Sequence, residues 1–213
     1  MIPLILRLKK ESHKEIAKAQ DLIVKELYKV FNDAVLHGGT AIWRCYNGNR
    51  FSEDVDVYIK KDEKKLNILF DNLKRNGFFI EKKKISENSL YSNLKFNGTF
   101  VKLEALFKRT KGILGNYEES DGNITTVYTL IPEGLINEKI NTYLKRLKIR
   151  DLYDIFFLLK YVKNENQIEK KIKELIKNFK NPIDEKELKI LLLEGIVPST
   201  DEMLNYIQRG IKN

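Results

Sequence analysis

The hydrophobic pattern changes its period at Pro132, and this change constrains the fold more than any other feature of the sequence. Before this residue, short runs such as 54–59 and 99–107 alternate apolar and polar side chains, which is typical of half-buried strands. From Pro132 almost to the end, apolar residues recur at helical spacing, and proline suits the first turn of a helix. The sequence predicts an α+β fold, with a mixed β-sheet domain over residues 1–131 and a helical region over 132–213.

The same criteria predict the individual elements. Helices are predicted over 11–31, from about 41, and over 63–75; strands are predicted over 34–36, 54–59, 78–85, 90–96, 99–107 and 125–131. The three strands between 78 and 107 are expected to form an antiparallel meander. The polar, glycine-rich connection 108–123 is predicted to be a loop. In the helical region, breaks are expected near Lys148, at 181–182 and at 197–198.

The composition narrows the class of protein. The 213 residues include 39 Lys and Arg against 30 Asp and Glu, a net charge of +9 that favours a polyanionic partner. One cysteine, Cys45, and two histidines cannot build a disulfide scaffold or a zinc ribbon, so a reducing, cytoplasmic location is expected. No apolar run approaches the roughly 18 residues that span a bilayer, and the opening segment does not have the pattern of a signal peptide. We therefore expect no membrane partner.

Three carboxylates are candidate metal ligands. Asp54 and Asp56 lie two residues apart on a predicted strand, so their side chains point to the same face. Mg²⁺, or Mn²⁺ in its place, prefers oxygen ligands combined with waters and substrate phosphates. Glu104 lies on another alternating run and would complete a two-metal site, in which paired cations stabilise the attacking and leaving oxygens of a phosphoryl displacement. We expect Asp54, Asp56 and Glu104 to bind metal and to be catalytic.

The segment Gly38-Gly39-Thr40 is a candidate phosphate site. It follows a short predicted strand and precedes a helical pattern, and its glycines leave backbone N–H groups unobstructed beside a helix start. The glycines would thus bind the phosphates, and the carboxylates the metal ion, of one metal–nucleotide complex. A tight turn between a strand and a helix also requires glycine for backbone reasons alone.

A third group lies in the helical region. Lys139, Tyr143, Arg146, Arg150 and Asp154 follow one another at steps of three and four residues, so a continuous helix would place them along one face. The expected break in this region makes the alignment approximate. A lysine and two arginines in a cleft would hold triphosphate oxygens or balance the charge of a transition state.

Together these motifs resemble the AbiEii type of nucleotidyltransferase toxin, in the DNA polymerase β-like nucleotidyltransferase superfamily. The resemblance rests on four segments in the family's order, from about 36 to 159: the Gly-Gly-Thr turn, 50–57 (RFSEDVDV), the strand with Glu104, and the stretch from 138 to 154. It implies a nucleotidyltransferase fold and metal-dependent transfer of a nucleoside monophosphate from an NTP. A tRNA acceptor and an antitoxin partner are also implied, and Lys139 and Asp154 are the implied functional residues of the last segment. The third acidic position is commonly aspartate in this family, and here it is Glu104.

Other interpretations of the same residues stay open. An Asp-X-Asp pair on a strand is often a solvated edge, and the lysines and arginines of a basic helix often face solvent. The acceptor of the transferred group could be a small molecule or a protein instead of RNA. A basic module that binds nucleic acid or a partner protein, without catalysis, is the alternative of a different class.

Overall fold

The computed structural model describes residues 2–210 and divides the chain into two compact units. The first comprises the residues up to 47 together with 51–129, and the second comprises 48–50 together with the residues from 130 on. The short segment 48–50 therefore belongs with the helical unit, although it lies far from the rest of that unit in sequence. Within the described residues, no helix combines the length and the apolar character needed to cross a membrane.

The first unit is a mixed, seven-stranded sheet with helices, so the α+β prediction is confirmed. The strand order is β3-β4-β5-β2-β1-β7-β6; β2 runs parallel to β5 and β1 parallel to β7, and the other pairs are antiparallel. The strands are β1 (Val35–His37), β2 (Val55–Ile59), β3 (Phe79–Ile85), β4 (Ser89–Phe96), β5 (Thr99–Phe107), β6 (Ile113–Glu118) and β7 (Ile124–Thr129). The helices of this unit are α1 (Leu4–Arg7), α2 (Glu11–Val30), α3 (Gly38–Cys45) and α4 (Glu63–Arg75).

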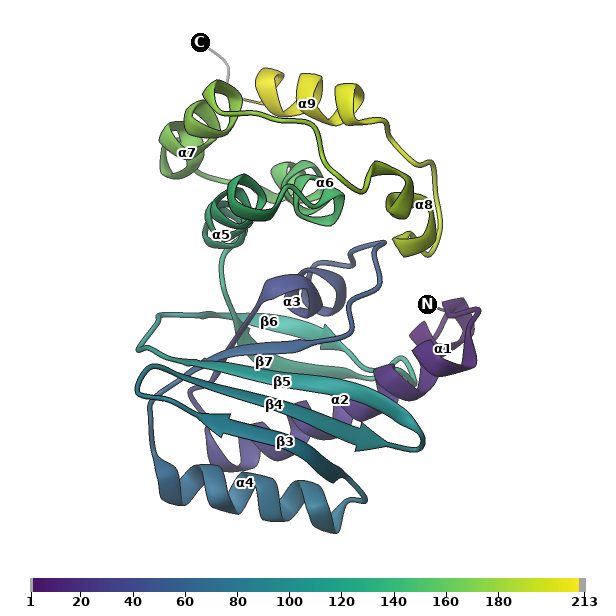
Figure 1. The fold of residues 1–213 in the computed structure, drawn as a ribbon, viewed down its shortest axis with the longest axis vertical. Coiled ribbons are helices and arrows are strands. Elements are labelled where there is room, and N and C mark those ends of the chain that lie inside the picture. Colours follow the sequence, from purple (N-terminus) through teal and green to yellow (C-terminus); the bar gives the residue numbers. More distant parts are fainter. Residues whose placement is uncertain (1, 211–213) are drawn as a thin grey trace. The chain divides into compact units, whose positions relative to one another are not determined.

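The core of this unit lies between one face of the sheet and the helices α2 and α4. Figure 1 shows α2 crossing behind the strands, with α4 beside it. The alternating residues of the central strands, among them Val55, Val57, Leu94 and Leu103, are almost fully buried against these helices. Burial of such side chains contributes about 1.5–3 kcal/mol each. The residues between them, which include the candidate carboxylates, point to the opposite face.

The segment 108–123 is not a continuous loop, so that prediction is wrong. Its middle part, Ile113–Glu118, forms β6, which pairs with β7 at the edge of the sheet. Gly115, which weakens the strand pattern in the sequence, packs against Thr129: a Cβ atom at position 115 would lie 2.8 Å from Thr129 Cγ2. This edge strand pairs with one neighbouring strand and packs against α3, so its stability depends on residues that are distant in sequence. The helical turn α1 also had no counterpart among the predicted elements.

The second unit is helical. Its longer helices are α5 (Pro132–Arg146), α6 (Ile149–Leu158), α7 (Asn166–Lys177) and α9 (Thr200–Arg209), and its short ones are η1 (Leu159–Tyr161), η2 (Glu185–Glu187) and α8 (Leu188–Leu191). The expected break near Lys148 is confirmed: Leu147 has a left-handed backbone (φ 50°) and separates α5 from α6. α9 begins with a capping box, in which Ser199 and Glu202 each accept a hydrogen bond from the other's backbone N–H.

Candidate active site

Register places two of the predicted carboxylates on adjacent strands. Asp56 of β2 lies opposite Glu104 of β5, and on its other side it lies opposite His37 of β1. Residues opposite one another in adjacent strands have their side chains on the same face, within about 5 Å. The Asp-X-Asp pattern and the strand of Glu104 thus meet in the centre of the sheet, although about fifty residues separate them.

The charges of this cluster repel one another. Burial, followed by the negative charges of Asp56 and Asp54, raises the pKa of Glu104 above its ordinary value. Lys102 opposes this effect: its Nζ atom lies 3.5 Å from Asp54 Oδ1, and Asp54 raises the pKa of Lys102 in return. Among residues 2–210, no three His, Cys, Asp or Glu side chains are arranged as the ligands of a metal ion. Asp54, Asp56 and Glu104 nonetheless carry carboxylate oxygens, the type of ligand atom that Mg²⁺ prefers in proteins.

The glycine segment forms the first turn of α3 and lies directly beside Asp56. Gly38 has a left-handed backbone (φ +69°), and a Cβ atom there would lie 2.1 Å from Asp56 Oδ2. Only glycine allows the chain to approach this carboxylate so closely. The N-terminus of α3 has no side-chain cap from His37, whose ring instead stacks on Tyr58 with 4.0 Å between ring centroids. The first N–H groups of α3 therefore point out of the helix beside Asp56.

Thr40 has a structural role in addition to its position in the turn. Its side chain is buried, and its hydroxyl donates a hydrogen bond to the backbone carbonyl of Asp54. Gln20 of α2 supports the same segment: its Nε2 atom donates to the Ser52 carbonyl (2.8 Å) and to Thr40 Oγ1 (3.3 Å). The chain leading into β2 is thereby fixed to α2 and α3. The hydroxyl of Thr40 is therefore engaged within the protein.

Gln20 is a residue that sequence reasoning missed. It lies four residues after Ile16 and three before Ile23, so it occupies the apolar face of α2, and its side chain is fully buried. A polar residue in that position was the available signal.

In the helical unit, the structure brings together most of the predicted residues as one ion-pair network. Lys139 of α5 lies 2.7 Å from Asp154 and 3.2 Å from Asp151, both of α6. Arg146 contacts Asp151 with both Nε (2.6 Å) and Nη2 (2.9 Å). Asp151 and Asp154 are almost fully buried. The network therefore compensates buried negative charges, in addition to any role with a ligand.

Arg50 completes this network and was not among the predicted residues. Its Nε and Nη2 atoms each lie 2.8 Å from one carboxylate oxygen of Asp154, a bidentate arrangement. Burial pushes the pKa of Asp154 up, but Arg50 and then Lys139 outweigh burial and hold that pKa below its ordinary value. Arg50 belongs to the segment 48–50, so this ion pair accounts for the membership of that segment in the helical unit.

Two of the five residues that were predicted to share one helix face lie outside the ion-pair network. Tyr143 is fully buried and donates its hydroxyl proton to the Lys180 carbonyl (2.6 Å), so its placement on a functional face was wrong. Arg150, in the first turn of α6, is half-buried and makes no ion pair with any described residue. The left-handed Leu147 explains the position of Arg150, because it breaks the continuous helix on which the five residues would have shared one face; Tyr143 lies before the break and is directed into the core of the unit.

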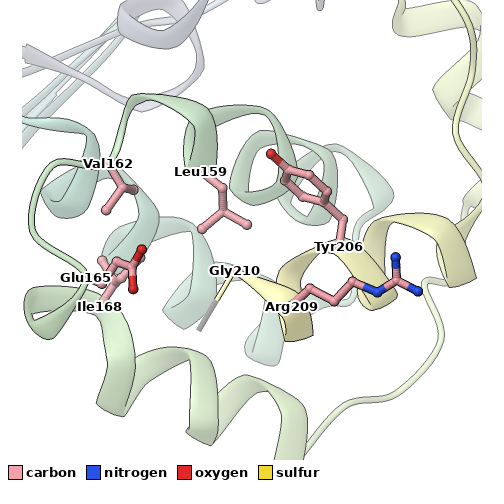
Figure 2. A pocket seen from close by; sticks show the side chains of 7 residues that line it. All are labelled: Leu159, Val162, Glu165, Ile168, Tyr206, Arg209 and Gly210. Carbon is pink, nitrogen blue, oxygen red and sulfur yellow. The ribbon is translucent and has the colours of Figure 1, made fainter. Parts of the chain in front are cut away.

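A cavity of about 480 Å³ lies within the helical unit and is shown in Figure 2. Its walls combine apolar side chains with Glu165 of the α6–α7 connection and Arg209 of α9, whose charged groups appear on different sides of the opening. The predicted residues of this unit are not among the described residues that line it. The cavity is thus separate from the ion-pair network.

Comparison with known proteins identifies the family. The family model described as "Nucleotidyl transferase AbiEii toxin, Type IV TA system" matches residues 23–209. The chain belongs to this family. It is accordingly a nucleotidyltransferase of the toxin class from type IV toxin–antitoxin systems, and the resemblance noted in the sequence is confirmed.

Solved structures share the AbiEii fold. JHP933 from Helicobacter pylori is 22% identical with a TM-score of 0.66, and the match covers 94% of this chain and 92% of that one. The nucleotidyltransferase toxin MenT4 from Mycobacterium tuberculosis is 16% identical with a TM-score of 0.65, and the match covers 96% of this chain and 85% of that one. At these identities the likeness establishes the fold alone. A search of curated proteins finds no match.

Proposed function

We propose that this AbiEii family member transfers a nucleoside monophosphate from an NTP to an acceptor hydroxyl of RNA, with tRNA as the acceptor class, and that an antitoxin protein counteracts it in the cytoplasm. The observation that carries the proposal is the alignment of Asp56 and Glu104 on adjacent strands, beside the N-terminus of α3. Carboxylates next to the N-terminus of a helix suit a metal-bound polyphosphate better than a neutral ligand.

In this proposal Asp54, Asp56 and Glu104 hold Mg²⁺ or Mn²⁺. The raised pKa of Glu104 supports it, because burial and then the negative charges of Asp56 and Asp54 cause the shift, and a cation would neutralise those charges. Asp54 would exchange its contact with Lys102 for the cation. The ion supplies a positive charge to the phosphoryl oxygens as negative charge develops on them.

The next roles belong to groups of the sheet unit. The N–H groups of Gly38, Gly39 and Thr40 bind phosphate oxygens, favoured by the dipole of α3. The carboxylate of Glu104, which lies opposite Asp56, accepts the proton of the acceptor hydroxyl.

For the helical unit we propose that Lys139, Arg146 and Arg150 bind triphosphate oxygens. Asp154 would orient Lys139, and the 2.7 Å contact between them supports this role. Arg146 is the more exposed of the two cations that pair with Asp151, since 38% of its side chain is accessible against 10% for Lys139. A phosphate could therefore reach Arg146 without breaking the buried pairs.

The experiment is a transfer assay with each labelled NTP in turn, Mg²⁺ or Mn²⁺, and total tRNA. The parent should label RNA, and Asp56→Asn should not. Asp71→Asn is the matched control, because Asp71 is an exposed aspartate of α4 that, among the described residues, forms an ion pair with Lys74 of the same helix alone. Circular dichroism should show all three proteins folded.

The outcomes separate the parts of the proposal. Label on a small molecule or on protein, lost in Asp56→Asn, would replace the RNA acceptor and keep the carboxylate chemistry. Label on RNA that persists at parental rate in Asp56→Asn would refute the assignment of the carboxylates. Absence of transfer, together with absence of thermal stabilisation by NTP and Mg²⁺, would refute the nucleotide site, since a ligand that binds only the folded state raises its stability.

A further inference from the structure

The face of the sheet that carries the carboxylates extends over β5, β4 and β3 as a surface of aromatic and lysine side chains. Register defines its rows, since residues opposite one another share a face. The row farthest from the carboxylates is Phe79, Lys95 and Phe100. The row that contains a carboxylate is Lys84, Tyr91 and Glu104, and it continues to Asp56 on β2. We call the six aromatic and lysine residues Phe79, Lys82, Lys84, Tyr91, Lys95 and Phe100 the lysine–aromatic face.

Two of its aromatic rings are unusually exposed. Phe79 is 64% and Phe100 is 50% accessible, whereas Leu94 and Val101, which alternate with them on the core side, are buried. Lysines flank the rings: Lys95 Nζ lies 5.8 Å from the Phe100 ring centroid, and Lys82 Nζ lies 5.6 Å from that of Tyr91. Exposed rings interleaved with cations are the composition of surfaces that bind single-stranded nucleic acid, where bases stack and phosphates pair with lysines.

Protection of the sheet edge accounts for only part of this surface. Lysines on an edge strand discourage pairing with another chain, and β3 is the edge strand here. That purpose explains Lys82 and Lys84. It does not explain Lys95 and Phe100, because β4 and β5 are interior strands, and exposed phenylalanines add to the risk of association instead of reducing it.

We propose that the lysine–aromatic face binds a single-stranded segment of the RNA acceptor, with bases stacked on Phe100 and Tyr91 and phosphates on the lysines. Tyr91 adjoins Glu104, and Phe100 lies four residues before Glu104 on β5, about 14 Å at the usual rise of a strand. A strand bound in this way runs toward the carboxylates. The inference rests on the proposed function for the identity of the acceptor as RNA.

The test measures binding without turnover. A fluorescent single-stranded oligoribonucleotide is titrated with the protein in the absence of NTP and divalent metal, and anisotropy gives Kd. Phe100→Ala should weaken binding at least about 5-fold, the effect of losing one stacked base, and Phe100→Trp should retain it. Ile68→Ala is the matched control: Ile68 is 53% exposed on α4, and its loss should leave Kd unchanged.

Salt dependence tests the lysines. In a plot of log Kd against log salt concentration, Lys95→Gln should reduce the slope by about 0.7, the value for one phosphate contact with a single strand. Lys64→Gln, which removes an exposed lysine of α4, should leave the slope unchanged. Thermal unfolding of each variant verifies that the fold is retained, and Tyr91→Ala provides a second aromatic variant.

The proposal is overturned if the parent binds the oligonucleotide and both aromatic variants match Ile68→Ala, or if the parent does not bind single strands at all. These results can be distinguished from results that would refute the proposed function. Transfer of label to a different acceptor, lost in Asp56→Asn, would leave the chemistry intact while the RNA surface is refuted. Conversely, single-strand binding that depends on Phe100 in a protein without transfer activity would support the surface alone.

Discussion

Gly38→Ala tests how closely the chain must approach the carboxylates. Gly38 has φ +69°, and a non-glycine residue in the left-handed region costs about 1–2 kcal/mol. In addition, the new Cβ atom would lie 2.1 Å from Asp56 Oδ2, so the carboxylate or the turn must move by about 1 Å to reach an ordinary contact distance. Both effects act on the same variant, and a second glycine is needed to separate them.

Gly77→Ala provides that separation. Gly77 also has a left-handed backbone (φ +89°), but the nearest atom to a Cβ there is Phe96 Cε2 at 3.9 Å, an ordinary contact. The left-handed backbone alone should lower the free energy of unfolding of both variants by about 1–2 kcal/mol, or Tm by about 2–8 °C for a chain of this size, and the clash at Gly38 adds to this loss. Only Gly38→Ala should lose transfer activity, by about 100-fold, because a shift of about 1 Å in a catalytic group has that effect.

Differential scanning fluorimetry and the labelled-NTP assay supply the two measurements. If Gly38→Ala retains the activity of Gly77→Ala at equal stability, the contact between the turn and Asp56 does not position the carboxylate, and the reasoning is refuted. Equal loss of activity in both variants would attribute the effect to general destabilisation.

Three further changes have defined outcomes. Burial and then the two aspartates raise the pKa of Glu104 above 4.5. The contribution of Glu104 to stability is therefore complete below pH 4.5 and is lost as the pH rises through the raised pKa. Glu104→Gln should have the higher Tm near pH 7, and the difference between the two proteins should vanish near pH 4. Gln20→Leu leaves the buried Ser52 carbonyl without its donor and should cost about 1–3 kcal/mol in urea unfolding. Asp154→Asn removes the bidentate carboxylate partner of the buried Arg50 and should cost about 3–5 kcal/mol in the same assay; a loss under about 1 kcal/mol would contradict the buried pair.

Local periodicity was enough to predict most of the elements. The alternation in 54–59 and 99–107, and the helical spacing in 11–31 and 63–75, each reflect a single amphipathic element packed on one core. The break near Lys148 was also readable, although the left-handed residue is Leu147, one position earlier. The strand β6 is the exception: the glycine and polar residues of 108–123 indicated a loop, whereas pairing with β7 and packing against α3 hold 113–118 as a strand.

Only part of the chemistry of the site could be predicted from the sequence. The types and order of the motifs indicated carboxylates and a phosphate-binding turn, but their side-chain partners depend on packing between distant segments. Thr40 illustrates this: the turn suggests a phosphate contact, whereas its hydroxyl is engaged by the backbone of Asp54. Arg50 is similar, because its partner Asp154 lies more than a hundred residues away in sequence.

No local sequence pattern predicts the register between adjacent strands. A shift of one residue between β2 and β5 would move Glu104 to the opposite face from Asp56, and the same shift between β4 and β5 would bury Lys95 against the helices. The buried residues fix the register, since Val55, Val57, Leu103 and Leu94 must all face α2 and α4. The positions of the carboxylates and of the lysine–aromatic face therefore follow from the apolar residues between them. Substitutions in that apolar set should alter both surfaces together, whereas substitutions on the open face should alter one alone.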